Sequence, residues 1–177
     1  MTEFRPLDER TVFTGYILRV AVASFVAPDG TIFERDIVRH PGAVAVVPID
    51  GEEVVLVRQY RAAIDAHLLE IPAGLRDIAG EALEDTARRE LLEETGLVAG
   101  RLEKVAGVHN SVGFSDEMIH IFLATELSET DRTVTESPEE IDMEILRVPL
   151  AAAPELIASG EITDAKTVIG LLAALRR

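Results

Sequence analysis

Short apolar runs separated by turn residues fill the first half of the chain. These runs are rich in β-branched residues and predict strands over residues 16–26, 31–38, 43–47, 54–60 and 68–71. Turns are indicated by Pro28-Asp29-Gly30 and by Asp50-Gly51, which lie between neighbouring runs. The run at 43–47 is continuously apolar and is typical of a strand buried on both faces. We therefore expect an N-terminal antiparallel β unit followed by a buried strand.

The spacing of apolar residues changes after Glu81. Leu83, Ala87 and Leu91 recur every four residues, which predicts one amphipathic helix over residues 81–95. Gly96 stands where such a helix is expected to end, because glycine readily adopts the left-handed conformation of a helix C-terminus.

Strands and helices alternate in the rest of the chain. Apolar runs predict strands at 102–108 and 118–124, and alternation with polar residues predicts a half-buried strand over 141–145. The acidic stretch 128–140 is expected to be a loop, and helices are expected over 150–158 and 163–175. The chain thus begins with strands and continues with a mixture of strands and helices, an order that predicts a layered α/β or α+β domain.

Composition and charge narrow the function. The length of 177 residues favours one domain that needs no disulfide or metal to fold. The net charge of −15, from 17 basic and 32 acidic residues, disfavours binding to nucleic acid or to an anionic membrane. The absence of cysteine excludes thiol catalysis and Cys-zinc sites. No apolar run approaches a membrane span of about 18 residues and no signal peptide is visible, so we expect a cytoplasmic protein.

The densest chemical signal is the segment Arg89-Glu90-Leu91-Leu92-Glu93-Glu94-Thr95-Gly96-Leu97. Residues three and four apart are neighbours on a helix, so Glu90, Glu93 and Glu94 project from one side. Three carboxylates this close repel one another unless a cation lies among them, and hard oxygen ligands suit Mg²⁺ or Mn²⁺ rather than zinc. The alternative is a solvated acidic face held by helix salt bridges such as Arg89 to Glu93.

The flanking residues resemble the Nudix box. Its pattern is Gly, five residues, Glu, seven residues, then Arg-Glu-aliphatic-any-Glu-Glu-any-Gly-aliphatic. Here Gly74 precedes Glu81, and seven residues separate Glu81 from Arg89. The one departure is that six residues rather than five separate Gly74 from Glu81. The extra residue falls in a loop, where insertions are tolerated.

The resemblance to the Nudix family implies a metal-dependent hydrolase of a nucleoside diphosphate linked to another group. The fold implied is an α/β/α sandwich around a mixed β-sheet. The resemblance places Glu90, Glu93 and Glu94 at the family's metal-ligand positions, with the backbone carbonyl of Ala73 completing the set. It gives Arg89 the role of orienting the ligand carboxylates.

Several further segments resemble the ADP-ribose pyrophosphatase branch of that family. They are Arg58-Gln59-Tyr60-Arg61, Glu70-Ile71-Pro72-Ala73-Gly74, Gly113-Phe114-Ser115-Asp116-Glu117 and Ile162-Thr163-Asp164-Ala165-Lys166-Thr167. Enzymes of this branch carry an extra N-terminal β unit that dimerises. The resemblance therefore implies a homodimer, with residues 1–41 as the dimerisation subdomain and 42–177 as the Nudix domain.

The same resemblance implies the substrate contacts. It places Arg61 at the substrate phosphates or terminal ribose, with Arg35, Glu70 and Phe114 as further contacts. Arginine suits phosphate because its planar fork matches the oxygens, although Arg61 is also readable as a surface residue and Arg35 as an edge-strand charge. Val112 stands where the branch usually has proline, which leaves room for another nucleoside diphosphate sugar such as a GDP-hexose.

The general base is expected in the acidic loop. In the ADP-ribose branch a glutamate from the loop before the last strand activates the attacking water, and Glu139 and Glu140 stand at that place. The two remain alternatives, with Glu139 slightly favoured. A solvated acidic loop is the other interpretation, and a non-catalytic nucleotide sensor is the alternative function.

Overall fold

The computed structural model describes residues 3–131 and 141–177, and the chain divides into two compact units. The first consists of Met1–Gly42 with His109–Met118, and the second of Ala43–Val108 with Ile119–Arg177. The expected candidates Glu139 and Glu140 lie outside the described residues.

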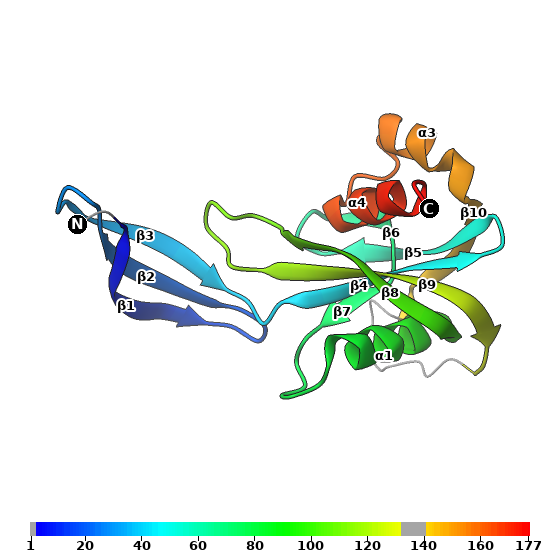
Figure 1. The fold of residues 1–177 in the computed structure, drawn as a ribbon, viewed down its shortest axis with the longest axis horizontal. Coiled ribbons are helices and arrows are strands. Elements are labelled where there is room, and N and C mark those ends of the chain that lie inside the picture. Colours follow the sequence, from blue (N-terminus) through cyan, green and yellow to red (C-terminus); the bar gives the residue numbers. More distant parts are fainter. Residues whose placement is uncertain (1–2, 132–140) are drawn as a thin grey trace. The chain divides into compact units, whose positions relative to one another are not determined.

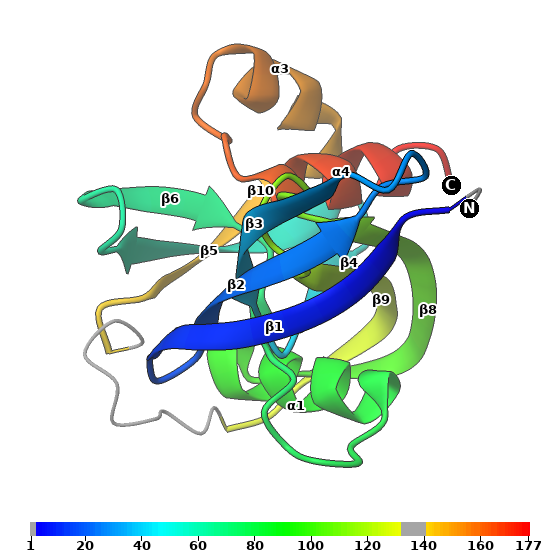
Figure 2. The ribbon, with the colours of Figure 1, turned by 90° about the vertical axis from the view of Figure 1, so that its left-hand side faces the viewer.

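The first unit is a three-stranded antiparallel sheet in the order β1-β2-β3 (Figure 2). Its strands are β1 (Arg5–Thr14), β2 (Arg19–Val26) and β3 (Ile32–Arg39). The expected turn joins β2 to β3, where the Thr31 amide donates to Asp29 Oδ1 at 2.9 Å. Sequence patterning missed β1, because its charged residues interrupt the apolar alternation and nearly all of its side chains are exposed.

The segment His109–Met118 is bound to β3. The Val38 amide donates to the Phe114 carbonyl at 2.7 Å, and the Asp116 amide donates to the Val38 carbonyl at 3.2 Å. The Asp116 carboxylate accepts from Arg39 Nη1 at 3.0 Å and from the His40 amide at 2.9 Å. The motif that begins at Gly113 is therefore held by the small sheet.

The second unit is built on a mixed sheet in the order β10-β5-β4-β9-β8, with β6 paired to β5 and β7 paired to β4. Neighbours β4 and β9 run parallel, whereas β4 pairs antiparallel with β5 and β5 with β10. The strands are β4 (Ala43–Asp50), β5 (Glu53–Arg61), β6 (Ala66–Glu70), β7 (Ala73–Leu75), β8 (Leu97–His109), β9 (Met118–Glu129) and β10 (Glu144–Pro149).

Helices cover both faces of this sheet (Figure 1). On one face, α1 (Leu83–Thr95) buries Ala87 and Leu91 against residues of β4 and β9 such as Val46 and Phe122. On the other face, α3 (Ala153–Ala158) and α4 (Ala165–Ala174) close a second core. The expected α/β/α sandwich is confirmed.

The predicted strand over 141–145 is wrong. Strand β10 begins at Glu144, which pairs with Arg58 of β5, and Ile141 is 66% exposed. The inward side chains of β10 are Leu146 and Val148, so the alternation read at 141–145 belongs to the approach to the strand. The other predicted elements are present with shifted ends, and α1 starts at Leu83 rather than at residue 81. Strand β7 was not predicted.

Among the described residues, none of the helices is long and apolar enough to cross a membrane.

Candidate active site

Helix α1 turns two of its glutamates inward. Its apolar stripe is buried in the core, and Glu90 and Glu94 follow Ala87 and Leu91 by three residues, so they lie beside that stripe. Only 8% of Glu90 and 7% of Glu94 is exposed. A solvated acidic face therefore does not describe these two residues. Gly96 ends the helix with φ 72° and donates its amide to the Leu92 carbonyl, as its C-terminal position predicted.

The Glu90 carboxylate lies directly against Gly74 of β7. A Cβ atom added at Gly74 would be 1.9 Å from Glu90 Cδ and 2.0 Å from Oε2. No side chain fits in that space, so glycine at this position is what lets the carboxylate approach the backbone of β7.

The backbone beside Gly74 is bound to the same helix. Glu94 Oε2 accepts a hydrogen bond from the Ala73 amide at 3.1 Å, and the Pro72 carbonyl accepts from the Val46 amide at 2.8 Å. Strand β7 pairs with β4, so Ala73 is held between a buried strand and the acidic edge of α1.

Arg89 binds the acidic side chains around it. Its Nη1 is 2.7 Å from Glu90 Oε1 and 3.1 Å from Glu93 Oε2, and its Nε and Nη2 are each 3.3 Å from an oxygen of Glu81. Burial alone would lower the pKa of Arg89, but the hydrogen bonds that it donates to Glu81 and the charges of Glu90 and Glu93 raise it. The Arg89–Glu93 pair expected across one helical turn is confirmed.

Burial also shifts the titration of Glu90. Desolvation raises the pKa of this carboxyl to about 7; the charge of Arg89 opposes the shift and that of Glu93 adds to it. A buried carboxyl with a raised pKa between like charges is common at functional sites. A cation bound here would restore the charged form.

The donor set fits a divalent cation. Carboxylate oxygens are hard ligands of the kind that Mg²⁺ and Mn²⁺ prefer, and those of Glu90 and Glu94 lie against the backbone of Gly74 and Ala73. Within residues 3–131 and 141–177, no three acidic or histidine side chains already surround one point. In this arrangement Arg89 bridges Glu90 and Glu93, and Glu94 accepts from the Ala73 amide.

A second charged cluster surrounds Glu70, whose side chain is 1% exposed. Arg61 binds it with two parallel hydrogen bonds, Nε to Oε1 at 2.7 Å and Nη2 to Oε2 at 2.6 Å. Lys166 Nζ also donates to Glu70 Oε2 and lies 3.0 Å from Asp164 Oδ2. The structure therefore brings together Arg61 and Glu70, which the sequence singled out separately.

Comparison with known proteins decides the family. The model of the NUDIX domain matches residues 39–168. The chain belongs to the NUDIX family. This confirms the resemblance of the box around Glu90.

Two relatives that match over most of their length carry the same name in two organisms. The chain is 39% identical over 177 residues to an ADP-ribose pyrophosphatase of Bacillus subtilis, covering 94% of this chain and 92% of the relative. It is 38% identical over 172 residues to an ADP-ribose pyrophosphatase of Mycobacterium tuberculosis, covering 97% and 83%. The fold is similar to a crystal structure of an ADP compounds hydrolase, with a TM-score of 0.86, 23% identity, and coverage of 99% and 94%.

Two of the expected Nudix substrate contacts belong to the first unit. Arg35 lies on β3, where its Nη1 donates to the Glu34 carbonyl and its guanidinium lies 4.7 Å from the centre of the Phe33 ring. Phe114 lies in the segment bound to β3 and is 55% exposed. The Glu90 and Glu70 clusters belong to the second unit.

Sequence reasoning missed two charged residues of these clusters. Asp77 lies 3.5 Å from Arg89 Nη2, and Lys166 shares Glu70 with Arg61. Asp77 lies in a loop and Lys166 lies 96 residues from Glu70, so no regular spacing along the chain links either residue to its partner. The stretch 162–167 did resemble the ADP-ribose branch, but no role followed for Lys166 from that resemblance.

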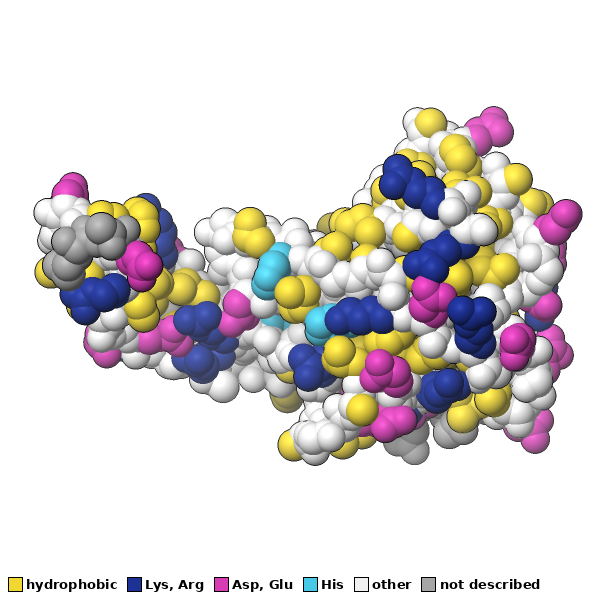
Figure 3. Space-filling view, viewed as in Figure 1, with side chains coloured by type: hydrophobic (Ala, Val, Ile, Leu, Met, Phe, Trp, Pro, Cys, Tyr) yellow, Lys and Arg dark blue, Asp and Glu magenta, His cyan; other side chains and the backbone are white. Residues whose placement is uncertain are grey.

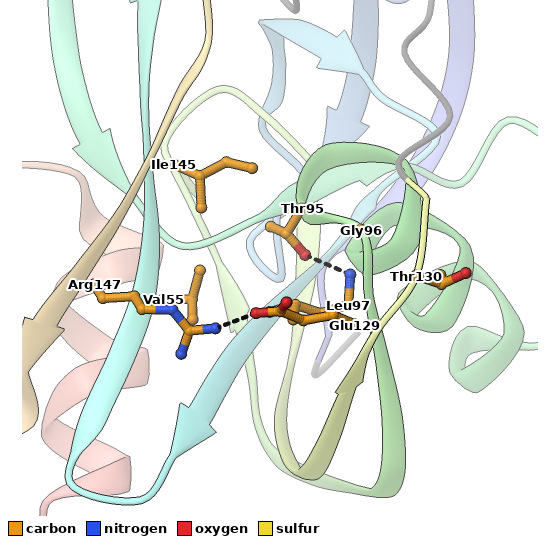
Figure 4. A pocket seen from close by; sticks show the side chains of 8 residues that line it. All are labelled: Val55, Thr95, Gly96, Leu97, Glu129, Thr130, Ile145 and Arg147. Carbon is orange, nitrogen blue, oxygen red and sulfur yellow. Dashed lines mark hydrogen bonds and ion pairs between the residues drawn. The ribbon is translucent and has the colours of Figure 1, made fainter.

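A cavity of about 230 Å³ lies at the C-terminal end of α1 (Figure 4). Its eight lining residues are Val55, Thr95, Gly96, Leu97, Glu129, Thr130, Ile145 and Arg147. None of the predicted site residues is among them. Arg147 is bound there to Glu129 at 2.9 Å and is also paired with Asp50, so its charge is already neutralised.

Proposed function

We propose that the protein hydrolyses the diphosphate of ADP-ribose to AMP and ribose 5-phosphate in the presence of Mg²⁺. The observation that carries the proposal is the pair of buried carboxylates of α1, Glu90 and Glu94, against the backbone of Ala73 and Gly74. The substrate follows from two relatives of similar length, each named ADP-ribose pyrophosphatase.

The metal ligands we propose are Glu90, Glu93 and Glu94, with the carbonyl of Ala73. A cation held there would offset the repulsion between an anionic substrate and a chain of net charge −15. When bound, Mg²⁺ supplies charge neutralisation and a water of lowered pKa. Arg89 keeps Glu90 and Glu93 in fixed positions through its Nη1.

Side chains of the protein bind the substrate. Arg61 binds the diphosphate, since its fork is anchored by Glu70 and 40% of its side chain remains exposed. Arg35 and Phe114 contact the nucleotide or the terminal ribose. The general base that takes the proton from the attacking water is Glu139 or Glu140, because the carboxylates of α1 are occupied as ligands.

A homodimer through the first unit completes the proposal. Many large apolar side chains of the three-stranded sheet are exposed to solvent. Some of them are visible in yellow on the face drawn in Figure 3. Exposed residues of this kind are Phe4, Leu7, Val12, Phe13, Tyr16, Ile17 and Ile32. A second copy of the chain would bury them, and residues 1–41 would then act as the dimerisation subdomain.

Val112 favours one alternative substrate class. Its side chain is 77% exposed in the segment that carries Phe114, so no packing demand explains valine there. Proline would fix the backbone at this position, whereas valine leaves it adaptable. A nucleoside diphosphate hexose such as GDP-mannose is therefore the second candidate.

A panel of substrates tests the proposal. ADP-ribose, GDP-mannose, NADH and diadenosine polyphosphates are incubated with Mg²⁺ and the wild-type protein, and products are separated by ion-exchange chromatography. ADP-ribose should show the highest kcat/KM. A higher value for GDP-mannose would overturn the branch, and Val112→Pro would then be expected to lower the GDP-mannose preference.

A further inference from the structure

Lys166 is one of only two lysines in the chain, and it is buried. It lies in the first turn of α4 with 8% of its surface exposed. Removing an ammonium group from water is costly, and a buried ion pair is often no more stabilising than apolar residues of the same size. A lysine at this position therefore calls for a role beyond packing.

Lys166 is held by two carboxylates, and the residue after it is bound to the chain next to Glu70. Its Nζ donates to Glu70 Oε2 and lies 3.0 Å from Asp164 Oδ2. The next residue, Thr167, is fully buried and accepts a hydrogen bond on Oγ1 from the Ile71 amide at 2.9 Å. The start of α4 is therefore bound to the backbone segment that leads from Glu70 into β7.

Glu70 is shared between two cations. Arg61 binds both of its oxygens, and Lys166 binds one of them. A carboxylate with Arg61 as its only partner would form a pair of zero net charge. Lys166 and Asp164 add one positive and one negative charge to this pair, so the four side chains carry no net charge. Without Lys166, the carboxylates of Glu70 and Asp164 would outweigh the single charge of Arg61.

One nitrogen of Arg61 is not used by the contact with Glu70. Within residues 3–131 and 141–177, no hydrogen bond uses Arg61 Nη1. The hydrogen bond with Glu70 raises the pKa of Arg61, and the charge of Glu94 contributes to the same shift, which places Arg61 within electrostatic reach of a proposed metal ligand. A guanidinium held by two of its nitrogens can offer the third to a phosphate oxygen without further loss of side-chain entropy.

We propose that Lys166 is a positioning residue for substrate binding: by sharing Glu70 with Arg61, it fixes the orientation of Arg61, and its charge offsets a carboxylate that would otherwise repel the diphosphate. This inference rests on the proposed function. It predicts that Lys166 affects affinity for a nucleoside diphosphate only through Arg61, and that it leaves the metal site unchanged.

The test is a double-mutant cycle read by isothermal titration calorimetry. The probe is an ADP-ribose analogue with a methylene group in place of the bridging oxygen, titrated in saturating Mg²⁺. Losing a charged hydrogen bond to a phosphate is worth roughly a 10- to 100-fold change in Kd, which is expected for Arg61→Met. Lys166→Met should weaken binding about 3- to 10-fold, because Arg61 remains but is less well oriented.

Non-additivity is the decisive result. The double variant should bind no more weakly than Arg61→Met alone, because Lys166 acts through that residue. Titration with Mg²⁺ alone should match the wild type in all variants, and for ADP-ribose hydrolysis Lys166→Met should raise KM with kcat nearly unchanged. Lys104→Met, the same change at the exposed lysine of β8, is the matched control and should bind like the wild type.

A structural role alone would give a different outcome. Lys166→Met would then leave Kd unchanged, add its full effect to that of Arg61→Met, or weaken Mg²⁺ binding; each result overturns the inference.

If Lys166→Met does not fold, Lys166→Arg and Lys166→Gln replace it. Arginine, which keeps the charge, should bind more tightly than glutamine, and equal Kd values would overturn the inference. A wild-type protein that neither binds the analogue nor cleaves ADP-ribose would refute the proposed function itself.

Discussion

At the scale of single residues, the site depends on contacts that sequence spacing only partly predicts. The spacing of the Nudix box placed Glu90 and Glu94 on one side of a helix, and the structure shows both buried beside β7. The Nudix box also has a glycine upstream of the helix. Gly74 takes that position, and its lack of a side chain leaves room for the Glu90 carboxylate. Lys166 could not be found this way, because its partner Glu70 is 96 residues distant and only the folded chain brings them together.

Replacing Gly74 with alanine should displace Glu90. A methyl group there would overlap the carboxylate at 1.9 Å, so the side chain must move away from β7. Displacing a metal ligand should weaken Mg²⁺ binding by roughly 10- to 100-fold, as is typical when the support of a ligand is lost. Calorimetric titration with Mg²⁺ measures the effect.

Gly170→Ala is the control for a general loss of stability. Its Cβ would lie 2.8 Å from Val47 and 3.0 Å from Ile71 in the core under α4, which should lower the free energy of unfolding by about 1–3 kcal/mol. The folded control should still bind Mg²⁺ like the wild type. Equal Mg²⁺ affinity in Gly74→Ala and the wild type would show that Glu90 does not need its place against β7.

Mg²⁺ affinity should depend on pH through Glu90. Its pKa is raised from 4.5 to about 7 in the folded, metal-free protein, so the folded chain retains a proton that the unfolded chain releases. The contribution of Glu90 to the free energy of unfolding is fully present below pH 4.5. It is lost as the pH rises through 7, and the loss amounts to about 3 kcal/mol at most. Because Mg²⁺ must displace the proton, affinity should fall about tenfold per pH unit below 7.

Calorimetry in buffers of different ionisation enthalpy measures that proton release directly. The wild type should release about one proton per Mg²⁺ at pH 6 and fewer at pH 8.5. Glu90→Gln should bind Mg²⁺ weakly and without this pH dependence. An affinity that is constant from pH 5.5 to 7 would contradict the assignment of Glu90 as a ligand.

At the scale of elements, strongly periodic segments were predictable and their edges were not. Helix α1 and the buried strand β4 matched their apolar patterns closely. Strand β1 was missed because pairing with β2, rather than burial of an apolar face, holds its charged sequence in place. The strand expected at 141–145 was wrong because hydrogen bonding to β5 begins only at Glu144, whatever the alternation before it.

The acidic segment before β10 should hold the general base. Glu139→Gln or Glu140→Gln, whichever residue is the base, should lower kcat by about 10²- to 10⁴-fold, the usual range for general base catalysis. KM should stay nearly constant, because no contact with the substrate is lost. Steady-state kinetics on ADP-ribose distinguishes the two residues, since the other glutamine variant should retain activity. If both single variants and the double variant keep kcat within a few-fold, the base lies elsewhere.

At the scale of the whole molecule, the chain combines a layered Nudix domain with a small sheet that is rich in exposed apolar residues. The layered fold followed from the order of elements and the box, and the family match confirms it. The membership of His109–Met118 in the first unit could not be predicted, because its bonds to β3 connect segments about 75 residues apart. The loop that resembles a substrate motif is thus attached to the predicted dimerisation unit.

Light scattering at micromolar concentration should give twice the 19.3 kDa mass of the chain. Leu7→Asp combined with Phe13→Asp should produce a monomer with reduced activity, because charges would have to be buried in the interface and residues 10–38 are expected to contribute to both sites. Val98→Asp, at an exposed apolar residue of β8 in the second unit, should remain dimeric. A wild-type monomer with full activity would refute the proposed assembly.

The most direct test of the central claim is product analysis of ADP-ribose incubated with Mg²⁺ and either the wild type or Glu90→Gln. The wild type should release AMP and ribose 5-phosphate in equal amounts and stop when EDTA is added. Glu90→Gln should keep its fold by circular dichroism and release neither product at a measurable rate. No cleavage by the wild type, or equal cleavage by Glu90→Gln, would contradict the claim that the buried carboxylates of α1 hold the metal for this reaction.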